Sequence, residues 1–152
     1  MSAMEPALRT ARPDDAQALA DVFLAARGRA MPYLPDLHTE AETRGWIREV
    51  VLGGHEVVVA ESGGRLAGFA ALEGDVLGHL YVHPDLQGHG LGSALLRRAK
   101  EMRPSGFRLW VFQRNAGARR FYERRGLRLV ELTDGSGNEE REPDALYEWR
   151  PS

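Results

Sequence analysis

The chain of 152 residues contains no cysteine, which excludes disulfides, thiolate metal ligands and a cysteine nucleophile together. It also lacks an apolar run long enough to cross a bilayer, and Met1–Arg12 has no apolar core of the kind found in signal peptides. An excess of one charge is missing too, since 20 lysines and arginines stand against 22 acidic residues. We therefore expect a cytoplasmic protein that binds neither membranes nor nucleic acid.

Several familiar catalytic and phosphate-binding motifs are absent as well. No Gly-Lys-Ser/Thr sequence supports a P-loop, and no G-x-S-x-G elbow supports a serine nucleophile. In the one glycine-rich segment the third glycine comes one place too early for the dinucleotide fingerprint, and no acidic residue follows about 20 positions later. Nucleotide hydrolysis, dinucleotide binding and acyl-enzyme chemistry thus lose their main support.

Hydrophobic residues make up 43% of the chain, enough to bury one core in a single domain covering residues 1–152. Alternating and β-branched patterns predict strands at 7–11, 55–61, 65–72, 76–83, 107–112, 127–132 and 145–149. Helical spacing and capping residues predict four helices, from Asp14 to Gly28, from 40 to 52, from 90 to 102, and after Asn115. The second of these places Trp46, Ile47, Val50 and Val51 on one face. The order predicts an α/β (α+β) domain with one mixed, mostly antiparallel sheet of about seven strands flanked by about four helices.

The most informative segment is Leu80–Ser93, in which a strand breaks at Pro84 and the chain enters a helix through alternating glycines. The start of a helix presents unpaired backbone N–H groups and partial positive charge, and glycine allows the main chain to approach a ligand closely. These properties suit a pyrophosphate. The alternative is that the glycines only turn the chain.

This segment resembles the GNAT superfamily of N-acyltransferases. Gln87–Gly92 matches the Q/R-x-x-G-x-G/A signature, and Leu80–Val82 matches the strand before it. A second recurring segment of the family is matched by Asn115, Ala118, Phe121, Tyr122, Glu123, Gly126 and Leu127. The resemblance covers Ala7 to about Leu132, and implies a sheet splayed at its centre and acetyl-CoA-dependent transfer to the amine of a small molecule or peptide by direct attack.

The resemblance also implies roles for individual residues. It assigns the pyrophosphate to the amides of Gln87–Ser93 and the pantetheine arm to the preceding strand and Asn115. The expected cofactor-binding residues are Leu80, Tyr81, Val82, Gln87, Gly88, His89, Gly90, Leu91, Gly92, Ser93 and Asn115. Tyr122 matches the position from which a phenol, protonated at neutral pH, can protonate the departing thiolate. Its alternative role is a core aromatic beside Phe121.

The general base is open between Glu73, Asp75, His79 and a water molecule. His79 has an ordinary pKa suited to a base near neutrality, but strand alternation can turn it away from the site. Glu73 lies at a turn, where a solvated carboxylate is the common outcome. We expect no metal, because His79 and His83 on one strand would lie about 13 Å apart.

The acceptor is expected near the Met31–Leu37 loop and the second helix, with Tyr33, Leu34, His38 and Glu42 as binding candidates. The 133–144 loop carries acidic residues that either attract a cationic amine or keep the loop soluble, namely Glu139, Glu140, Glu142 and Asp144. A basic cluster is either a solvated helix face or a contact to the 3′-phosphate of CoA, and comprises Arg114, Arg119, Arg120, Arg124, Arg125 and Arg128.

Two further expectations complete the sequence-based picture. A non-catalytic acyl-CoA sensor or interaction module is the alternative to an enzyme, since it would keep the glycine-rich turn. A homodimer is also expected to be possible, because the final strand, 145–149, offers an edge for pairing between subunits.

Overall fold

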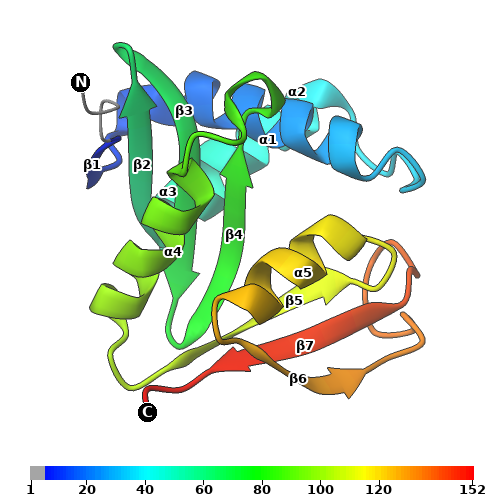
Figure 1. Ribbon diagram of the computed structural model, residues 1–152. Helices are drawn as coiled ribbons and strands as arrows, with labels where there is room; N and C mark the ends of the chain where they lie inside the picture. Colours follow the sequence, from blue (N-terminus) through cyan, green and yellow to red (C-terminus); the bar gives the residue numbers. More distant parts are fainter. Residues whose placement is uncertain (1–5) are drawn as a thin grey trace.

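The computed structural model describes residues 6–152 and contains a seven-stranded sheet in the order β1-β2-β3-β4-β5-β7-β6 (Figure 1). The strands are β1 (Ala7–Thr10), β2 (Glu56–Ser62), β3 (Arg65–Glu73), β4 (Val76–Val82), β5 (Phe107–Phe112), β6 (Arg128–Leu132) and β7 (Asp144–Trp149). The helices are α1 (Ala16–Ala30), α2 (Glu40–Trp46), α3 (Leu52–Gly54), α4 (Leu91–Met102) and α5 (Ala116–Arg124). A wider π-helical turn, Ile47–Val51, joins α2 to α3. The predicted mixed, mostly antiparallel sheet is confirmed.

Local sequence explains where two of the helices begin. The Thr39 hydroxyl accepts a hydrogen bond from the Glu42 amide at 3.1 Å, and the Glu42 carboxylate accepts one from the Thr39 amide at 2.8 Å. This reciprocal capping box starts α2. The Asn115 side chain caps α5 by accepting from the Ala118 amide at 3.3 Å.

Two details of the predicted helices are wrong. Gly28 does not end α1, which continues to Ala30. One glycine inside a helix costs only about 1 kcal/mol relative to alanine, and burial of the apolar helix face stabilises the helix by more than this. Val50 was expected in the core but is 49% exposed. The π turn explains this, because its wider spacing keeps Ile47 and Val51 on the buried face and rotates Val50 to solvent.

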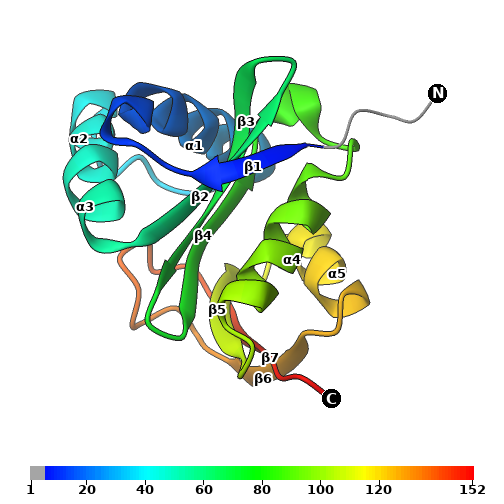
Figure 2. The ribbon, with the colours of Figure 1, turned by 90° about the vertical axis from the view of Figure 1, so that its left-hand side faces the viewer.

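The first half of the sheet is covered on both faces. Alternate residues of β2 point to opposite sides, so Val58 and Ala60 pack with α4, whereas Val57 and Val59 pack with α1 and the segment after α2. Figure 2 shows α1, α2 and α3 on one side of β1–β4 and α4 on the other. α5 packs against one face of the second half, β5-β7-β6, through Tyr122.

The two halves of the sheet meet along one short contact. β4 and β5 are parallel, and their only pairing within residues 6–152 is Val76 with Arg108. Beyond this point the strands diverge (Figure 1), so residues 77–82 of β4 have no strand partner on the β5 side. The splay leaves one edge of β4 open at the centre of the molecule.

The last strand does not offer an edge for dimerisation. β7 lies between β5 and β6 and pairs with both. The expectation that this strand pairs with a second copy is therefore wrong, because β6 closes the sheet at that end. Within the described part of the chain, no helix is long and apolar enough to cross a membrane.

Candidate active site between β4 and β5

The splay between β4 and β5 holds a cavity of about 660 Å³, which we call the splay cleft. Its walls are residues 77–82 of β4, the 87–93 turn, residues 109–112 of β5 and one face of α5. This volume lies in the range of small-molecule and cofactor sites. The cleft therefore brings together the two sequence segments that carried the family resemblance.

The turn into α4 presents a run of free backbone donors. None of the amides of residues 88–93 donates a hydrogen bond to another group within residues 6–152; the first amide of the helix to do so is that of Ala94, to the Gly90 carbonyl at 3.0 Å. Gly88 and Gly90 make the turn possible because their φ angles, +87° and +78°, lie in the left-handed region. Six consecutive amides at a helix start form an anion-binding surface.

One arginine adds positive charge beside these amides. Arg125 lines the splay cleft, donates a hydrogen bond from Nε to the Ser93 hydroxyl at 2.9 Å, and stacks on the Phe121 ring at 3.9 Å. Gly92 leaves room for Phe121, whose ring would lie 3.3 Å from a Cβ at that position. Of the six arginines in the basic cluster, Arg125 alone lines the cleft.

Tyr122 lies in the wall of the splay cleft. The residue is buried, yet its hydroxyl has no hydrogen-bond partner in the part of the chain that the structure describes. Burial, and to a lesser degree the nearby Tyr81, raise the pKa of the Tyr122 phenol above its ordinary value. Tyr122 therefore keeps its proton across the physiological pH range.

The other predicted cofactor-binding residues fall into two groups. Those that line the splay cleft are Leu80, Tyr81, Val82, Gln87, Gly88, Gly90, Leu91, Gly92, Ser93 and Asn115. His89 lies in the same turn, but its side chain is exposed and outside the cleft lining. The Gln87 side chain ties the turn to the strand by donating to the Val82 carbonyl at 3.4 Å.

A second cavity, of about 700 Å³, opens on the α1 side of the sheet, and we call it the aromatic cavity. Its walls come from α1, the 31–38 loop, the start of α2, and residues of β4, β5 and the 133–144 loop. Six residues line both the splay cleft and the aromatic cavity, namely Met31, Gly78, His79, Tyr81, Trp110 and Phe112. A ligand in one cavity can thus meet a ligand in the other along this shared wall.

His79 is the one ionisable base candidate at this junction. Its ring packs against Trp46 at 5.2 Å and His55 at 5.7 Å between ring centroids, and its Nδ1 atom is buried without a hydrogen-bond partner in the described chain. Burial, with a smaller contribution from His55, lowers the pKa of His79 to about 4. The ring is therefore neutral at pH 7.

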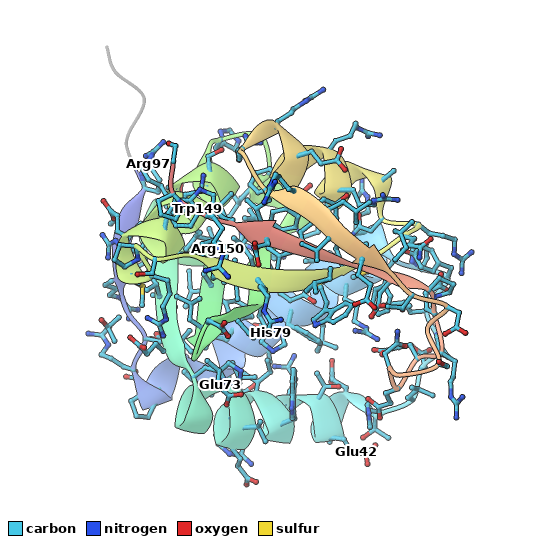
Figure 3. The ribbon with its side chains drawn as sticks, turned by 90° about the horizontal axis from the view of Figure 1, so that it is seen from below. Glu42, Glu73, His79, Arg97, Trp149 and Arg150 are labelled. Atoms are coloured by element: carbon cyan, nitrogen blue, oxygen red, sulfur yellow. The ribbon has the colours of Figure 1, made fainter. Side chains whose placement is uncertain are left out.

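The two carboxylate candidates for the base lie elsewhere. Glu73 ends β3 beside Gly54, and Asp75 follows in the hairpin turn; neither lines the splay cleft or the aromatic cavity. Figure 3 shows Glu73 and Glu42 near opposite ends of the α2–α3 segment, with His79 nearer the middle of the molecule. His79 lines both cavities and thus shares neither of them with Glu73 or Asp75.

Three of the four predicted acceptor-binding residues line the aromatic cavity, namely Leu34, His38 and Glu42. Tyr33 does not. Its ring lies under the Arg114 guanidinium at 3.9 Å, and its buried hydroxyl has no partner within residues 6–152. This contact fastens the 31–38 loop to the turn after β5.

The acidic residues of the 133–144 loop are mostly paired. Glu139 contacts His38 at 2.6 Å, Glu140 contacts Arg27 at 2.8 Å and Glu142 contacts Arg114 at 2.8 Å. Asp144 accepts hydrogen bonds from Thr133 and Asn138. These contacts attach the loop to α1 and to the 31–38 loop, so that it closes one side of the aromatic cavity.

Sequence reasoning missed several residues that line the cavities, above all Trp110. Along β5, Phe107, Leu109 and Val111 are buried, whereas Trp110 is 50% exposed and faces the cavities. A large aromatic residue at the solvent-facing position of an alternating strand is a usable signal. Among residues 6–152 no group of acidic or histidine side chains has a geometry that could hold a metal ion.

Comparisons with known proteins agree with this geometry. A family model described as an acetyltransferase (GNAT) domain matches residues 53–128. A protein named Probable N-acetyltransferase Rv2775, from Mycobacterium tuberculosis, is 32% identical over 111 residues, which cover 64% of this chain and 63% of that protein. The L-amino acid N-acyltransferase MnaT of Escherichia coli is 34% identical over 102 residues, covering 60% and 59%. This chain spans about six tenths of the length of these relatives.

The fold is shared with solved structures over the whole chain. A GCN5-related N-acetyltransferase from Rhodopseudomonas palustris superposes with a TM-score of 0.83 and 23% identity, covering 99% of each chain. At this identity the likeness establishes the shared fold.

Proposed function

The chain belongs to the GNAT acetyltransferase family, and from this we propose that it transfers the acetyl group of acetyl-CoA to a primary amine of a small molecule or a peptide. The observation that carries the proposal is the run of free amides at residues 88–93, which opens onto the splay cleft. The neighbouring aromatic cavity gives an acceptor a place to bind on the other side of the shared wall.

The residues of the splay cleft suit acetyl-CoA as a bound cosubstrate. The amides of residues 88–93 and the Arg125 guanidinium would hold the pyrophosphate, because both are donors with positive charge. The open edge of β4 and Asn115 would hold the pantetheine arm in the manner of an added strand. Acetyl-CoA supplies the acetyl group as a thioester that an amine can attack directly, and the chain has no cysteine for a covalent route.

Tyr122 is proposed as the general acid. Its phenol lies in the cleft wall, keeps its proton because burial raises its pKa, and has no competing hydrogen-bond partner in the described chain. Such a group can donate a proton to the departing thiolate. The unpaired hydroxyl of Tyr122, the burial of the residue and its position in the cleft wall together favour this role over that of a core aromatic.

His79 is proposed as the group that receives the proton of the attacking amine. It lies where the splay cleft meets the aromatic cavity, and its Nδ1 atom is free of other partners within residues 6–152. Because its pKa is about 4, His79 is a weak base at neutral pH. The proton that it accepts is therefore released to solvent and does not remain on the ring. Glu73, outside both cavities, would act only through intervening water.

The proposal is tested by two measurements on the folded protein. Titration calorimetry with acetyl-CoA measures binding to the splay cleft, and release of the CoA thiol across a panel of amines, amino acids, polyamines, aminoglycosides and peptides measures transfer. We expect both to be positive. Binding without thiol release from any acceptor would instead favour the non-catalytic sensor, and absence of binding would contradict both.

Homodimer formation and a cytoplasmic location stay predictions. Sedimentation equilibrium tests the first, with a mass near 34 kDa, twice the 16.9 kDa of the chain, as the expected result for a dimer. A pairing contact would involve β6 at the sheet edge, because both sides of β7 are taken.

A further inference from the structure

The aromatic cavity carries an excess of negative charge. Four carboxylates line it, from Asp36, Glu42, Glu139 and Glu140, against a single arginine, Arg27. The whole chain has a formal net charge of only −2, so this imbalance is a local property of the cavity. An acidic cavity raises the local concentration of cations and disfavours anions.

The one arginine of the cavity is already engaged. Arg27 donates to Glu140 at 2.8 Å, and its guanidinium lies 5.9 Å from the centre of the Phe23 ring. The carboxylate of Glu140 is well buried in this pair, with its side chain 15% exposed. A carboxylate on the acceptor that reached Arg27 would place a second anion beside Glu140 against one cationic charge, which is electrostatically unfavourable.

Two of the four carboxylates have no cationic partner. Within residues 6–152, neither Asp36 nor Glu42 forms a salt bridge, although both line the cavity. The amide and hydroxyl of Thr39 hold the pKa of Glu42 below its ordinary value, so this group stays ionised. Glu139, by contrast, contacts His38.

The inner wall of the cavity is aromatic. Phe23 meets Trp46 at 5.5 Å and Tyr81 at 5.1 Å between ring centroids, both edge to face, and Trp110 of β5 also lines the cavity. Such a wall accommodates an aromatic or branched apolar group, and aromatic faces attract ammonium ions. The aromatic wall packs against His79, and the acidic residues come from the 31–38 loop, α2 and the 133–144 loop.

We propose that the acceptor is a small primary amine with an aryl or bulky apolar body, which arrives as a cation and carries no carboxylate beside its amine. This proposal rests on the proposed acetyl transfer. This acceptor class differs from L-amino acids, the acceptors named for the E. coli relative MnaT. The reason is electrostatic: the carboxylate of an amino acid would enter an acidic cavity in which the only arginine is neutralised by Glu140.

Acceptors that differ in one group test the proposal. We compare 2-phenylethylamine with phenylalanine and phenylalaninamide, and tryptamine with tryptophan, by thiol release at saturating acetyl-CoA. We expect kcat/KM of each amine to exceed that of its amino acid by at least about tenfold. The kcat/KM of phenylalaninamide should be close to that of 2-phenylethylamine, because the amide differs from phenylalanine mainly in lacking the negative charge of the carboxylate. Equal or higher kcat/KM for the amino acids, or turnover confined to peptides or polyamines, would overturn it.

Two charge variants link the selectivity to the cavity. Glu42→Gln keeps the capping hydrogen bond of α2 and removes one charge, so KM for 2-phenylethylamine should rise about three- to fivefold at unchanged kcat. Glu49→Gln, an exposed residue outside the cavity, is the matched control and should leave KM unchanged. Glu140→Gln frees Arg27 and should raise kcat/KM for phenylalanine about tenfold.

The outcomes separate the two proposals. Thiol release with any acceptor of the wider panel supports acetyl transfer, even if amino acids prove to be preferred and the acceptor class is wrong. An unchanged ratio of amine to amino acid activity in Glu140→Gln, with normal thermal stability and acetyl-CoA binding, would also overturn the acceptor class. Failure of acetyl transfer itself would appear as silence with every acceptor.

Discussion

Tyr122 and Tyr147 are both buried tyrosines, but their hydroxyls have different surroundings. The Tyr147 hydroxyl donates to Glu123 and accepts from Arg119, whereas that of Tyr122 faces the splay cleft without a partner in the described chain. At the scale of single residues, a hydroxyl that opens on a cavity and has no partner is available to a ligand, whereas the paired Tyr147 hydroxyl is committed to the fold.

Replacing Tyr122 by phenylalanine should lower kcat by about a hundredfold or more while leaving the Kd of acetyl-CoA unchanged, because only the proton donor is removed. Steady-state kinetics and calorimetry measure the two quantities. Tyr147→Phe is the control: it breaks a paired hydroxyl and should cost about 1–2 kcal/mol of stability without lowering kcat. A Tyr122→Phe enzyme with kcat within twofold of the original would exclude the acid role.

His79 makes stability depend on pH. Its pKa is about 4 in the folded protein and about 6.5 when the chain is unfolded, so the unfolded state binds more protons between these values. Stability is therefore fully present above pH 6.5 and falls as the pH drops toward 4, by about 2–3 kcal/mol from this residue. Urea unfolding at pH 7.5 and 4.5 should show a smaller loss for His79→Phe than for the original protein; equal losses would refute the assignment.

At the scale of elements, most of the fold was predictable from local patterns. The capping residues Thr39 and Asn115 mark real helix starts, and the Gly63-Gly64 turn lies between β2 and β3 as expected. These features depend on neighbours in the sequence, which is why they can be read without a structure. The glycine-rich turn before α4 belongs to the same group.

The contents of the cavities were less predictable. Trp110, Phe23, Trp46 and Arg27 come from three distant segments, and the strand register and helix packing that bring them together are tertiary properties. The place of β7 between β5 and β6 is of the same kind, because a strand's neighbours cannot be deduced from its own residues. Sequence therefore identified the splay cleft better than the aromatic cavity.

The turn before α4 gives a prediction at this scale. Gly90→Ala places a Cβ on a residue with φ of +78°, which should destabilise the fold by about 1–2 kcal/mol and weaken acetyl-CoA binding at least about tenfold by disturbing the amides. Gly53→Ala, in α3 with open space around its Cα and no positive φ, is the control and should be neutral or stabilising. Unchanged affinity in Gly90→Ala would argue against the anion site.

At the scale of the whole molecule, a ligand in the splay cleft contacts both halves of the sheet. Because β4 and β5 share one pair of residues, the cleft is the main place where a bound molecule can connect them. Acetyl-CoA at about a hundred times its Kd should stabilise the fold by about 2.7 kcal/mol, a rise of about 5–10 °C in Tm.

Hydrogen exchange locates this stabilisation. We expect acetyl-CoA to slow exchange most at the amides of residues 88–93, which lack partners in the described chain, and along the open edge of 77–82, and less in β6 at the sheet edge. Uniform slowing across all strands would indicate stabilisation without a defined site.

The open seam between β4 and β5 also sets a limit on engineering this protein for heat resistance. Substitutions that drew the two strands together along residues 77–82 would complete a regular ladder and raise the melting point, but they would close the space in which ligands bind. Stabilising substitutions should therefore be made within each half of the sheet separately, since along the seam a gain in thermal stability would be a loss of ligand binding.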